Sequence, residues 1–319
     1  MDLSPEEFQF LRVPDILKES ISIPKKSPKT FSLVTLTLIF PLSLVILAQS
    51  LFADTILARL YQLIEMPTRT GSQAMLYKLL VLQFCYIIFL FTFSLLSTAA
   101  VTFTVASLYT SKPVSFSSTL AAIPIVFRRL FMTFIWVSLF MIIYNMVFLG
   151  FLLLLAIVEN VVLSMFAIIV VLLLFPFVHA YVNAFWHLAS VVSVLEPVYG
   201  FAAMKKSYAL LKGMTLMSFV LVLSYLAFCG VLNLVFGWIV VHGGESHAVL
   251  TRIIVGGLVV GGMVILNLVG LLVQSVFYYV CKSYHHQGID KHALYDHLGG
   301  YLGEYVPLKS SIQMENLEA

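Results

Sequence analysis

Charged residues are scarce in this sequence, and their scarcity excludes a water-soluble fold. Only 10% of the 319 residues are Asp, Glu, Lys or Arg, whereas 61% are hydrophobic. A soluble domain carries about 25% charged and about 45–50% apolar residues, and its interior has limited room for apolar surface. The composition therefore fits a protein whose solvent is the lipid bilayer. The net charge of +3, without a long basic block, gives no indication of nucleic-acid binding.

Motifs for catalysis and metal binding are also absent. The three cysteines, Cys85, Cys229 and Cys281, show no CxxC spacing, which indicates buried thiols rather than disulfides or zinc ligands. The sequence has no Walker A, GxGxxG, GxSxG or HExxH motif, and no acidic residue lies inside an apolar run, which disfavours a proton pump. We therefore expect a protein that is not an enzyme and that holds no metal or cofactor. A metal-dependent enzyme acting on lipid is the minor alternative.

Six apolar runs are long enough to cross the ~30 Å hydrocarbon core of a bilayer, which takes about 20 helical residues. We therefore predict an all-α polytopic membrane protein with six transmembrane helices, an N-terminal segment over 1–30, a transmembrane domain over 31–284 and a tail over 285–319. The predicted spans are 31–52, 76–110, 131–158, 163–194, 214–241 and 250–284.

The basic residues predict the orientation of these spans. Most of the 18 Lys and Arg residues fall before the first span, after the last span, or in the loops after the second and fourth spans. Because basic loops stay on the cytoplasmic side of a membrane, both termini are expected to be cytoplasmic. The host membrane would belong to the endomembrane system or be the plasma membrane.

The spans are predicted to form three similar units. Each unit begins with a proline and a short amphipathic helix, followed by basic residues, an odd-numbered span and a long even-numbered span; the prolines are Pro14, Pro113 and Pro197. Such a helix can lie in the membrane interface with its basic side chains at the headgroups. The third helix is predicted to present one apolar face, made of Phe201, Met204, Tyr208 and Leu211.

Basic residues in these units are our candidates for contact with lipid headgroups. The alternative is that they only mark the cytoplasmic loops of ordinary connecting segments. The candidate residues are Lys25, Lys26, Lys29, Arg128, Arg129, Lys205, Lys206 and Lys212.

Polar residues inside the even-numbered spans form a second candidate site, because polar groups at bilayer depth are costly and often functional. His179, Asn183 and His187 recur every four residues and so share one helical face. Asn267 and Gln274 lie seven residues apart in the last span. These five residues form either interhelical hydrogen bonds or a small hydrated cavity. Their pattern also predicts that the even-numbered spans pack centrally.

Two glycines of the last span, Gly257 and Gly261, form a GxxxG motif. Small residues at this spacing allow helix backbones to approach closely. We expect them to pack against the second or fourth span, with a homodimer contact as the alternative.

Two segments resemble a known pattern. Ala203, Ser207, Leu210 and Gly213 fit an Ala-x-x-x-Ser-x-x-Leu-x-x-Gly segment, and an aromatic pair followed by Lys282 and Gly288-Ile289-Asp290 closes the last span. These stretches resemble the membrane domain of glycerophosphodiester phosphodiesterases, and the whole chain is similar to a plant family of uncharacterised six-span proteins. The resemblance implies the fold. It does not imply phosphodiesterase activity, because no catalytic domain accompanies it.

Two functions follow from these patterns. The first is a non-enzymatic membrane protein that organises lipid, or a complex of membrane proteins, through its basic interfacial helices. The second is a transporter or channel for a small or amphiphilic solute that passes along the polar even-numbered spans.

Overall fold

A computed structural model describes residues 7–50, 70–111, 115–158, 160–243, 248–287, 294–295 and 298–300 of the chain. Within these ranges the chain is helical and forms no strand, and six helices are long and apolar enough to cross a membrane. The predicted fold class is confirmed. The elements are the 3₁₀-helix η1 (Glu7–Phe10), α1 (Val13–Lys26), α2 (Pro28–Val34), the π-helix η2 (Thr35–Ile39), α4 (Thr70–Tyr109), α5 (Phe116–Ala156), α6 (Val161–Leu195), α7 (Phe201–Leu211), α8 (Thr215–Val235), the π-helix η3 (Phe236–Val241) and α9 (Val249–Tyr284).

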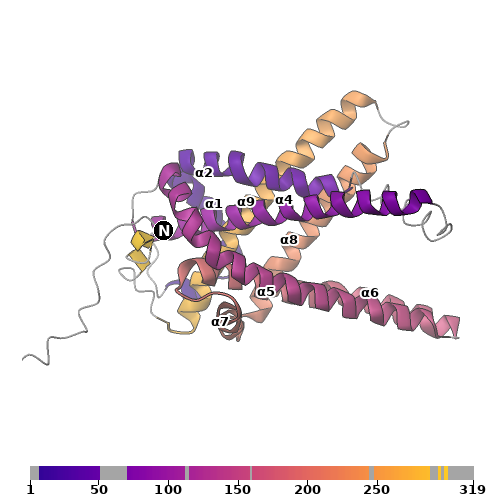
Figure 1. The fold of residues 1–319 in the computed structure, drawn as a ribbon. Helices are drawn as coiled ribbons and strands as arrows, with labels where there is room; N and C mark the ends of the chain where they lie inside the picture. The colour runs from indigo at the N-terminus through magenta and orange to yellow at the C-terminus, as the bar shows by residue number, and fades with distance from the viewer. Residues whose placement is uncertain are drawn as a thin grey trace, which may run out of the picture.

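The three even-numbered spans contact one another, while α6 also runs alongside α5 as a pair that diverges from the other spans (Figure 1). Helices α4, α6 and α9 contact one another, and each odd-numbered span packs against two of them. The first span, Pro28–Ser50, touches α4 and α9; α5 touches α4 and α6; and α8 touches α6 and α9. The predicted central packing is therefore correct only in part: the even-numbered spans contact one another, but 39% of the most apolar stretch of the first span is buried, against 6% for α6.

Each amphipathic segment lies against one of the central helices. α1 packs on α9 and α7 packs on α6, while the first turns of α5 meet α4, where the hydroxyls of Thr104 and Thr119 are 3.3 Å apart. The three units thus form a closed arrangement, in which the first and third units are in contact. Helix α1, at the start of the first unit, packs on α9, the last span of the third unit.

The second unit has no separate amphipathic helix, which corrects that part of the prediction. Helix α5 begins at Phe116, where the hydroxyl of Ser115 accepts the N–H of Ser118 at 3.0 Å, and it continues through Pro124 into the span. A proline removes one backbone hydrogen bond. A membrane protein tolerates this loss within a helix, because neighbouring elements can satisfy the freed carbonyl.

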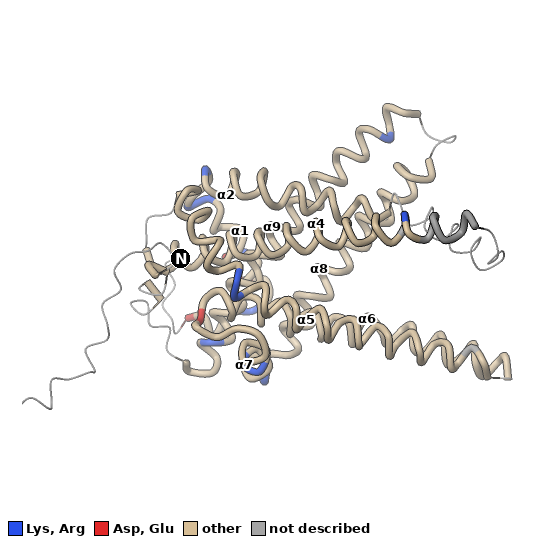
Figure 2. The backbone as a smooth tube through the Cα atoms, in the orientation of Figure 1, with Lys and Arg blue, Asp and Glu red and all other residues tan. Residues whose placement is uncertain are grey.

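Most basic side chains gather at one end of the bundle, where α1, α7 and the first turns of α5 lie (Figure 2). We call this the basic end, and the other the open end. Of the basic residues that the structure describes, Lys78 and Arg252 belong to the open end, since they stand at the starts of spans two and six. The charge asymmetry seen in the sequence is therefore an asymmetry of the fold. The side of the membrane on which each end lies is still a prediction.

The hydrophobic core is concentrated at the basic end. Phe8 of η1 is fully buried against Tyr109 and Tyr279, with ring centroids 5.9 and 6.0 Å away, and the two tyrosine rings stack at 4.7 Å. This aromatic cluster joins the N-terminal segment to the ends of α4 and α9.

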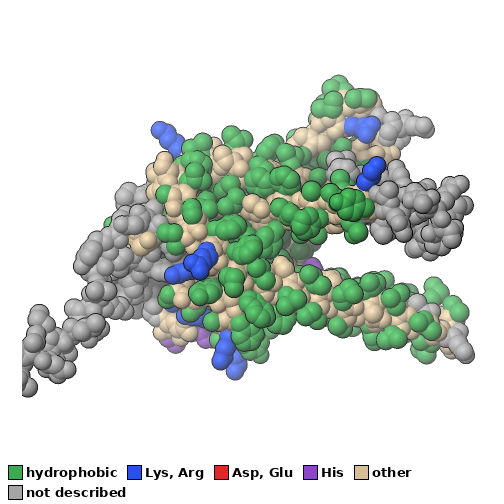
Figure 3. Space-filling model, in the orientation of Figure 1, with side chains coloured by type: hydrophobic (Ala, Val, Ile, Leu, Met, Phe, Trp, Pro, Cys, Tyr) green, Lys and Arg blue, Asp and Glu red, His purple; other side chains and the backbone are tan. Residues whose placement is uncertain are grey.

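At the open end, the helices separate. Figure 3 shows a V-shaped opening between the upper part of the molecule, which includes α4, and the pair α5–α6, with hydrophobic side chains along the pair. Large apolar side chains of the pair, such as Met146 and Leu173, are exposed. Such surfaces are suited to hydrocarbon rather than to water.

The turn from α7 into α8 requires a glycine. Gly213 has a φ of +89°, and a Cβ built there would lie 2.8 Å from the Tyr284 ring. A side chain at this position would be strained and would also displace Tyr284.

The apolar face predicted for α7 is partly wrong. Met204 and Leu211 are buried, but Phe201 and Tyr208 are each 61% exposed. The buried face includes Ala203 instead, together with Ser207 and Leu210. The reason is that α7 packs on another helix, α6, and small side chains allow that close approach; the Ser207 hydroxyl donates to the Phe185 carbonyl at 2.8 Å.

Candidate functional site

A cavity of about 370 Å³ lies inside the bundle, bordered by the first span, α4, α5, α6, α8 and α9. We call it the polar cavity. Four of the five predicted intramembrane polar residues line it, and further hydroxyl groups are added by residues that the sequence analysis did not connect with this site. The polar lining residues are Asn183, His187, Asn267, Gln274, Tyr225, Ser94, Thr98, Ser138 and Ser190.

Asn267 is the best-connected of these side chains. Its Oδ1 accepts the Tyr225 hydroxyl at 2.7 Å, and its Nδ2 donates to Oγ of Ser43 at 2.8 Å. One amide thereby ties the first span and α8 to α9. The Tyr225 ring lies over Gly270, where a built Cβ would come within 3.0 Å of the ring, so a larger residue at 270 would push the ring aside.

His187 and Gln274 have no such partners. Both side chains are half-buried, and neither forms a hydrogen bond with another residue in the described part of the chain; the His187 ring stacks only on Trp186, with centroids 6.0 Å apart. These two residues therefore hold free hydrogen-bonding capacity inside the bundle.

His179 is separated from the other predicted residues. Its ring lies 5.4 Å from Phe175 and 6.3 Å from Tyr144 of α5, and it borders neither of the cavities described here. Asn183 is connected to it only through the backbone, since its Nδ2 donates to the His179 carbonyl at 2.8 Å. A helix turns 100° per residue, so residues eight apart differ in direction by about 80°. Of the three residues predicted to share one face of this helix, Asn183 and His187 therefore line the polar cavity, and His179 does not.

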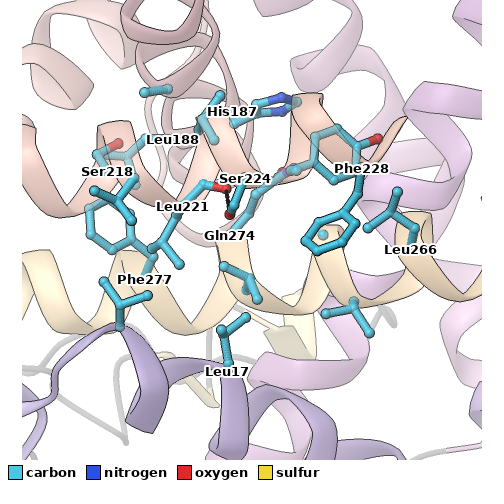
Figure 4. A pocket seen from close by; sticks show the side chains of 18 residues that line it. Leu17, His187, Leu188, Ser218, Leu221, Ser224, Phe228, Leu266, Gln274 and Phe277 are labelled. Carbon is cyan, nitrogen blue, oxygen red and sulfur yellow. Dashed lines mark hydrogen bonds between the residues drawn. The ribbon is translucent and has the colours of Figure 1, made fainter. Parts of the chain in front are cut away.

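A second cavity, of about 330 Å³, lies between α1, α6, α8 and α9 (Figure 4). We call it the apolar cavity, because its lining is mostly aliphatic and aromatic, with Leu17, Leu221, Phe228 and Phe277 among its residues. It shares four lining residues with the polar cavity, so the two cavities meet at one wall. The shared residues are His187, Tyr225, Gly270 and Gln274.

A buried carboxylate lies at the basic end, directly after α6. Glu196 is bonded to the ammonium group of Lys206, and its Oε1 accepts the Tyr278 hydroxyl at 2.6 Å. Lys282 lies 3.4 Å from the same oxygen. These four residues, which we call the Glu196 cluster, join the α6–α7 junction to α9.

The charge of Glu196 is maintained by its partners. Burial alone would raise the pKa of the carboxyl group, but the hydrogen bonds from Lys206 and Tyr278 and the positive charges of Lys282 and Lys206 outweigh burial and lower its pKa below the ordinary value. The Glu196 carboxylate is therefore ionised at neutral pH.

The predicted headgroup residues differ in their availability. Arg129 and Lys206 are half-buried, and Lys206 is bonded to Glu196. The other six residues lie exposed around the basic end, and we call them the basic rim: Lys25, Lys26, Lys29, Arg128, Lys205 and Lys212.

The GxxxG glycines do not contact another helix in the part of the chain that the structure describes. A Cβ built at Gly257 or Gly261 would have no atom within 4 Å. Their neighbours face α8 and η3 instead, because a Cβ at Gly262 would lie 3.5 Å from Leu232 and one at Gly256 would lie 3.6 Å from Val240. The expected packing against α4 or α6 is thus not present, and the homodimer contact stays an untested alternative.

The Glu196 cluster and the Ser43–Asn267–Tyr225 connection were missed by the sequence analysis. Lys206 was predicted as a headgroup residue, Lys282 was used only in the resemblance, and Glu196 was not predicted as a site residue. The predicted six-span topology could have indicated the cluster, because it places the ends of spans four and six, and so Glu196 and Lys282, at the same membrane face.

Six helices in the described part of the chain are long and apolar enough to cross a membrane, which defines a multi-pass membrane protein. The chain belongs to the family described as a domain of unknown function, DUF8558, whose model matches residues 1–317. No curated protein and no solved structure matches the chain. Neither the resemblance to a plant family nor that to the phosphodiesterase membrane domain gains support from these comparisons. The residues behind the second resemblance include Ala203, Ser207 and Leu210, which the structure uses to pack α7 on α6.

Proposed function

We propose that this chain is a non-enzymatic transport protein that takes a small or amphiphilic solute into the polar cavity. The observation that carries the proposal is that polar side chains from α4, α5, α6, α8 and α9 converge on one cavity. Polar groups at bilayer depth commonly mark solute pathways, and a volume of about 370 Å³ is in the range of small-molecule sites.

The lining of the cavity indicates what kind of solute would fit. No Lys, Arg, Asp or Glu is among the described residues that border the polar cavity. A charged solute would lose its hydration there without gaining a partner of opposite charge. The solute should therefore be uncharged overall and able to form hydrogen bonds.

The first prediction concerns His187. Replacing His187 by leucine should slow transport about tenfold, the effect of losing one hydrogen bond worth about 1.4 kcal/mol. The measurement uses proteoliposomes of the full chain and two uncharged probes: osmotic swelling in a glycerol gradient, and dithionite quenching of a monoacylglycerol whose acyl chain carries a nitrobenzoxadiazole group. Wild-type protein should accelerate at least one of these processes.

His179→Leu is the matched control, since it makes the same change on the same helix outside the cavity. It should retain the wild-type rate. The proposal is contradicted if wild-type vesicles respond to both probes no faster than protein-free vesicles, or if the two variants behave alike.

We also propose a second role, the organisation of anionic lipid around the basic rim. Its support is the exposure of six basic side chains at one end of the bundle, next to exposed apolar side chains such as Phe201 and Tyr208. In this proposal the basic end faces the cytoplasm, where the leaflet carries anionic lipid. Lys205 and Lys212 offer the simplest test, because both are exposed at α7.

The second prediction is that Lys205→Glu with Lys212→Glu weakens the preference for anionic lipid. Each basic residue near an anionic leaflet contributes about 1 kcal/mol, which is about fivefold. Electron spin resonance of spin-labelled phosphatidylserine and phosphatidylcholine in vesicles measures this preference. Lys78→Glu, at the open end, is the control and should leave it unchanged. An unchanged preference in the double variant would refute the role.

A further inference from the structure

The wall between the two cavities has an uncommon composition for a membrane interior. Two of its four residues, His187 and Gln274, are polar, half-buried and without a hydrogen-bond partner among the described residues. The other two, Tyr225 and Gly270, form a close contact that fixes the tyrosine ring. The free polar groups thus stand at the one place that both cavities reach.

On one side of this wall, the apolar cavity offers a site for a hydrocarbon chain. Leu17 of α1 lies on one side of it, α8 provides Leu221 and Phe228, and α9 provides Leu266 and Phe277 (Figure 4). In water, moving hydrocarbon among such side chains is favoured by about 0.8 kcal/mol per buried methylene. Inside a membrane the lipid tails are equally apolar, so the shape and packing of the cavity decide whether a chain binds there. The cavity therefore selects for a chain only when a polar group anchors it.

We infer that the two cavities together bind a neutral lipid with a single hydrocarbon chain, whose chain lies in the apolar cavity and whose hydroxyl or amide head is held between His187 and Gln274. This inference rests on the proposed function in one respect, that the polar cavity is a binding site. The imidazole and the amide can each both donate and accept a hydrogen bond, which suits a hydroxyl or an amide. A phosphate head is excluded, because neither cavity has a Lys or Arg among its described lining residues.

The side chains of Tyr225 and Asn267 give the head its position. The Tyr225 hydroxyl is already engaged by Asn267 at 2.7 Å, and the amide of Asn267 is engaged by Ser43. Tyr225 is therefore a structural member of the wall, held in place by Asn267, and His187 and Gln274 are the two wall residues left to bind the ligand.

The test is photolabelling of the purified full chain in phosphatidylcholine nanodiscs. The probe is a monoacylglycerol whose chain carries a diazirine and an alkyne, and the competitor is lysophosphatidic acid with the same chain. Labelled peptides, identified by mass spectrometry, should come from the α8 and α9 segments that line the apolar cavity. Unlabelled monoacylglycerol should compete, and lysophosphatidic acid should compete at least about tenfold more weakly.

Three variants complete the experiment. His187→Leu and Gln274→Leu should each weaken labelling about tenfold, while His179→Leu should not change it. Val269 lines the apolar cavity but not the polar cavity, so Val269→Phe should block labelling but leave glycerol flux intact.

Labelling spread evenly over the outer surface of the bundle, equal competition by lysophosphatidic acid, or full labelling of Val269→Phe would overturn the inference. The outcomes also separate this inference from the proposed function. Failure of the wild-type chain to accelerate flux of either uncharged probe, with labelling intact, would refute transport and leave the lipid site standing. Flux that depends on His187 without site-specific labelling would do the reverse.

Discussion

Replacing Glu196 by leucine is expected to destabilise the protein by about 3 kcal/mol, because it leaves the charges of Lys206 and Lys282 without their partner. The side chain of Glu196 is 8% exposed, and that of Lys282 is 19% exposed. Lys206, at 34% exposure, can turn toward water, which places the effect at the lower end of the range for broken buried ion pairs. Thermal unfolding in detergent, followed by tryptophan fluorescence, should show a fall in Tm of several degrees.

Two comparisons make this prediction specific. Glu19→Leu, on the partly exposed surface of α1, should leave Tm nearly unchanged. The double change Glu196→Leu with Lys206→Met should recover part of the loss, because one unpaired charge is removed as well. A Tm for Glu196→Leu equal to that of Glu19→Leu would contradict the role given to the cluster.

The pH dependence of the same residue follows from its lowered pKa. A carboxyl group whose pKa is lower in the folded than in the unfolded state stabilises the fold fully above its unfolded-state pKa, which is about 4.3. That contribution disappears as the pH falls through the folded-state value. The difference in stability between wild type and Glu196→Gln should therefore be constant above about pH 5 and shrink at lower pH.

The other large effect is expected for Phe8. Phe8→Ala removes a fully buried ring from between Tyr109 and Tyr279, and a change of this kind costs about 3–5 kcal/mol. Because η1 lies near the chain terminus, the loss should also appear as faster amide hydrogen exchange in the segment from η1 to the end of α1.

Phe10 supplies a matched control within the same 3₁₀ turn. It is 75% exposed, so Phe10→Ala should leave both Tm and exchange close to wild type. If the two alanine variants exchange at equal rates, the aromatic cluster does not hold the N-terminal segment.

The sequence was sufficient to predict the membrane class and the six spans. A long apolar run inside a bilayer has to bond its own backbone N–H and C=O groups, and a single run can do this only as a helix. It also predicted that the even-numbered spans contact one another, since polar side chains occur where another helix, rather than lipid, can face them; it did not predict the burial of the first span. The residues Asn267 and Gln274 illustrate this, because both line the polar cavity at the centre of the bundle.

What the sequence could not predict depends on rotation and on partners distant in the chain. The spacing places His179 and His187 near one helical face, yet eight residues at 100° each leave them about 80° apart. His179 therefore packs against Phe175, whereas His187 lines the polar cavity. Phe201 and Tyr208 looked like buried residues, because nothing local distinguishes the face that meets α6 from the face that meets lipid. The Glu196 cluster joins residues 82 positions apart, from Glu196 to Tyr278, and no local pattern records such a pairing.

The GxxxG motif is a clear example of a local pattern that can be used in more than one way. The motif predicts close packing of another helix at Gly257 and Gly261. In the described part of the chain no helix lies there, and the neighbouring Gly256 and Gly262 face Val240 and Leu232 instead. Glycine spacing alone therefore does not say which side of a helix is occupied.

The closed arrangement of the three units has a consequence for synthesis. α1 rests on α9, and Phe8 on Tyr279, so the segment from η1 to α1 leaves the ribosome well before its packing partner α9 has been made. At about 5–20 residues per second this interval lasts tens of seconds. During that time the apolar side of α1 can lie on the membrane surface, and the insertion of α9 then provides the helix on which α1 packs.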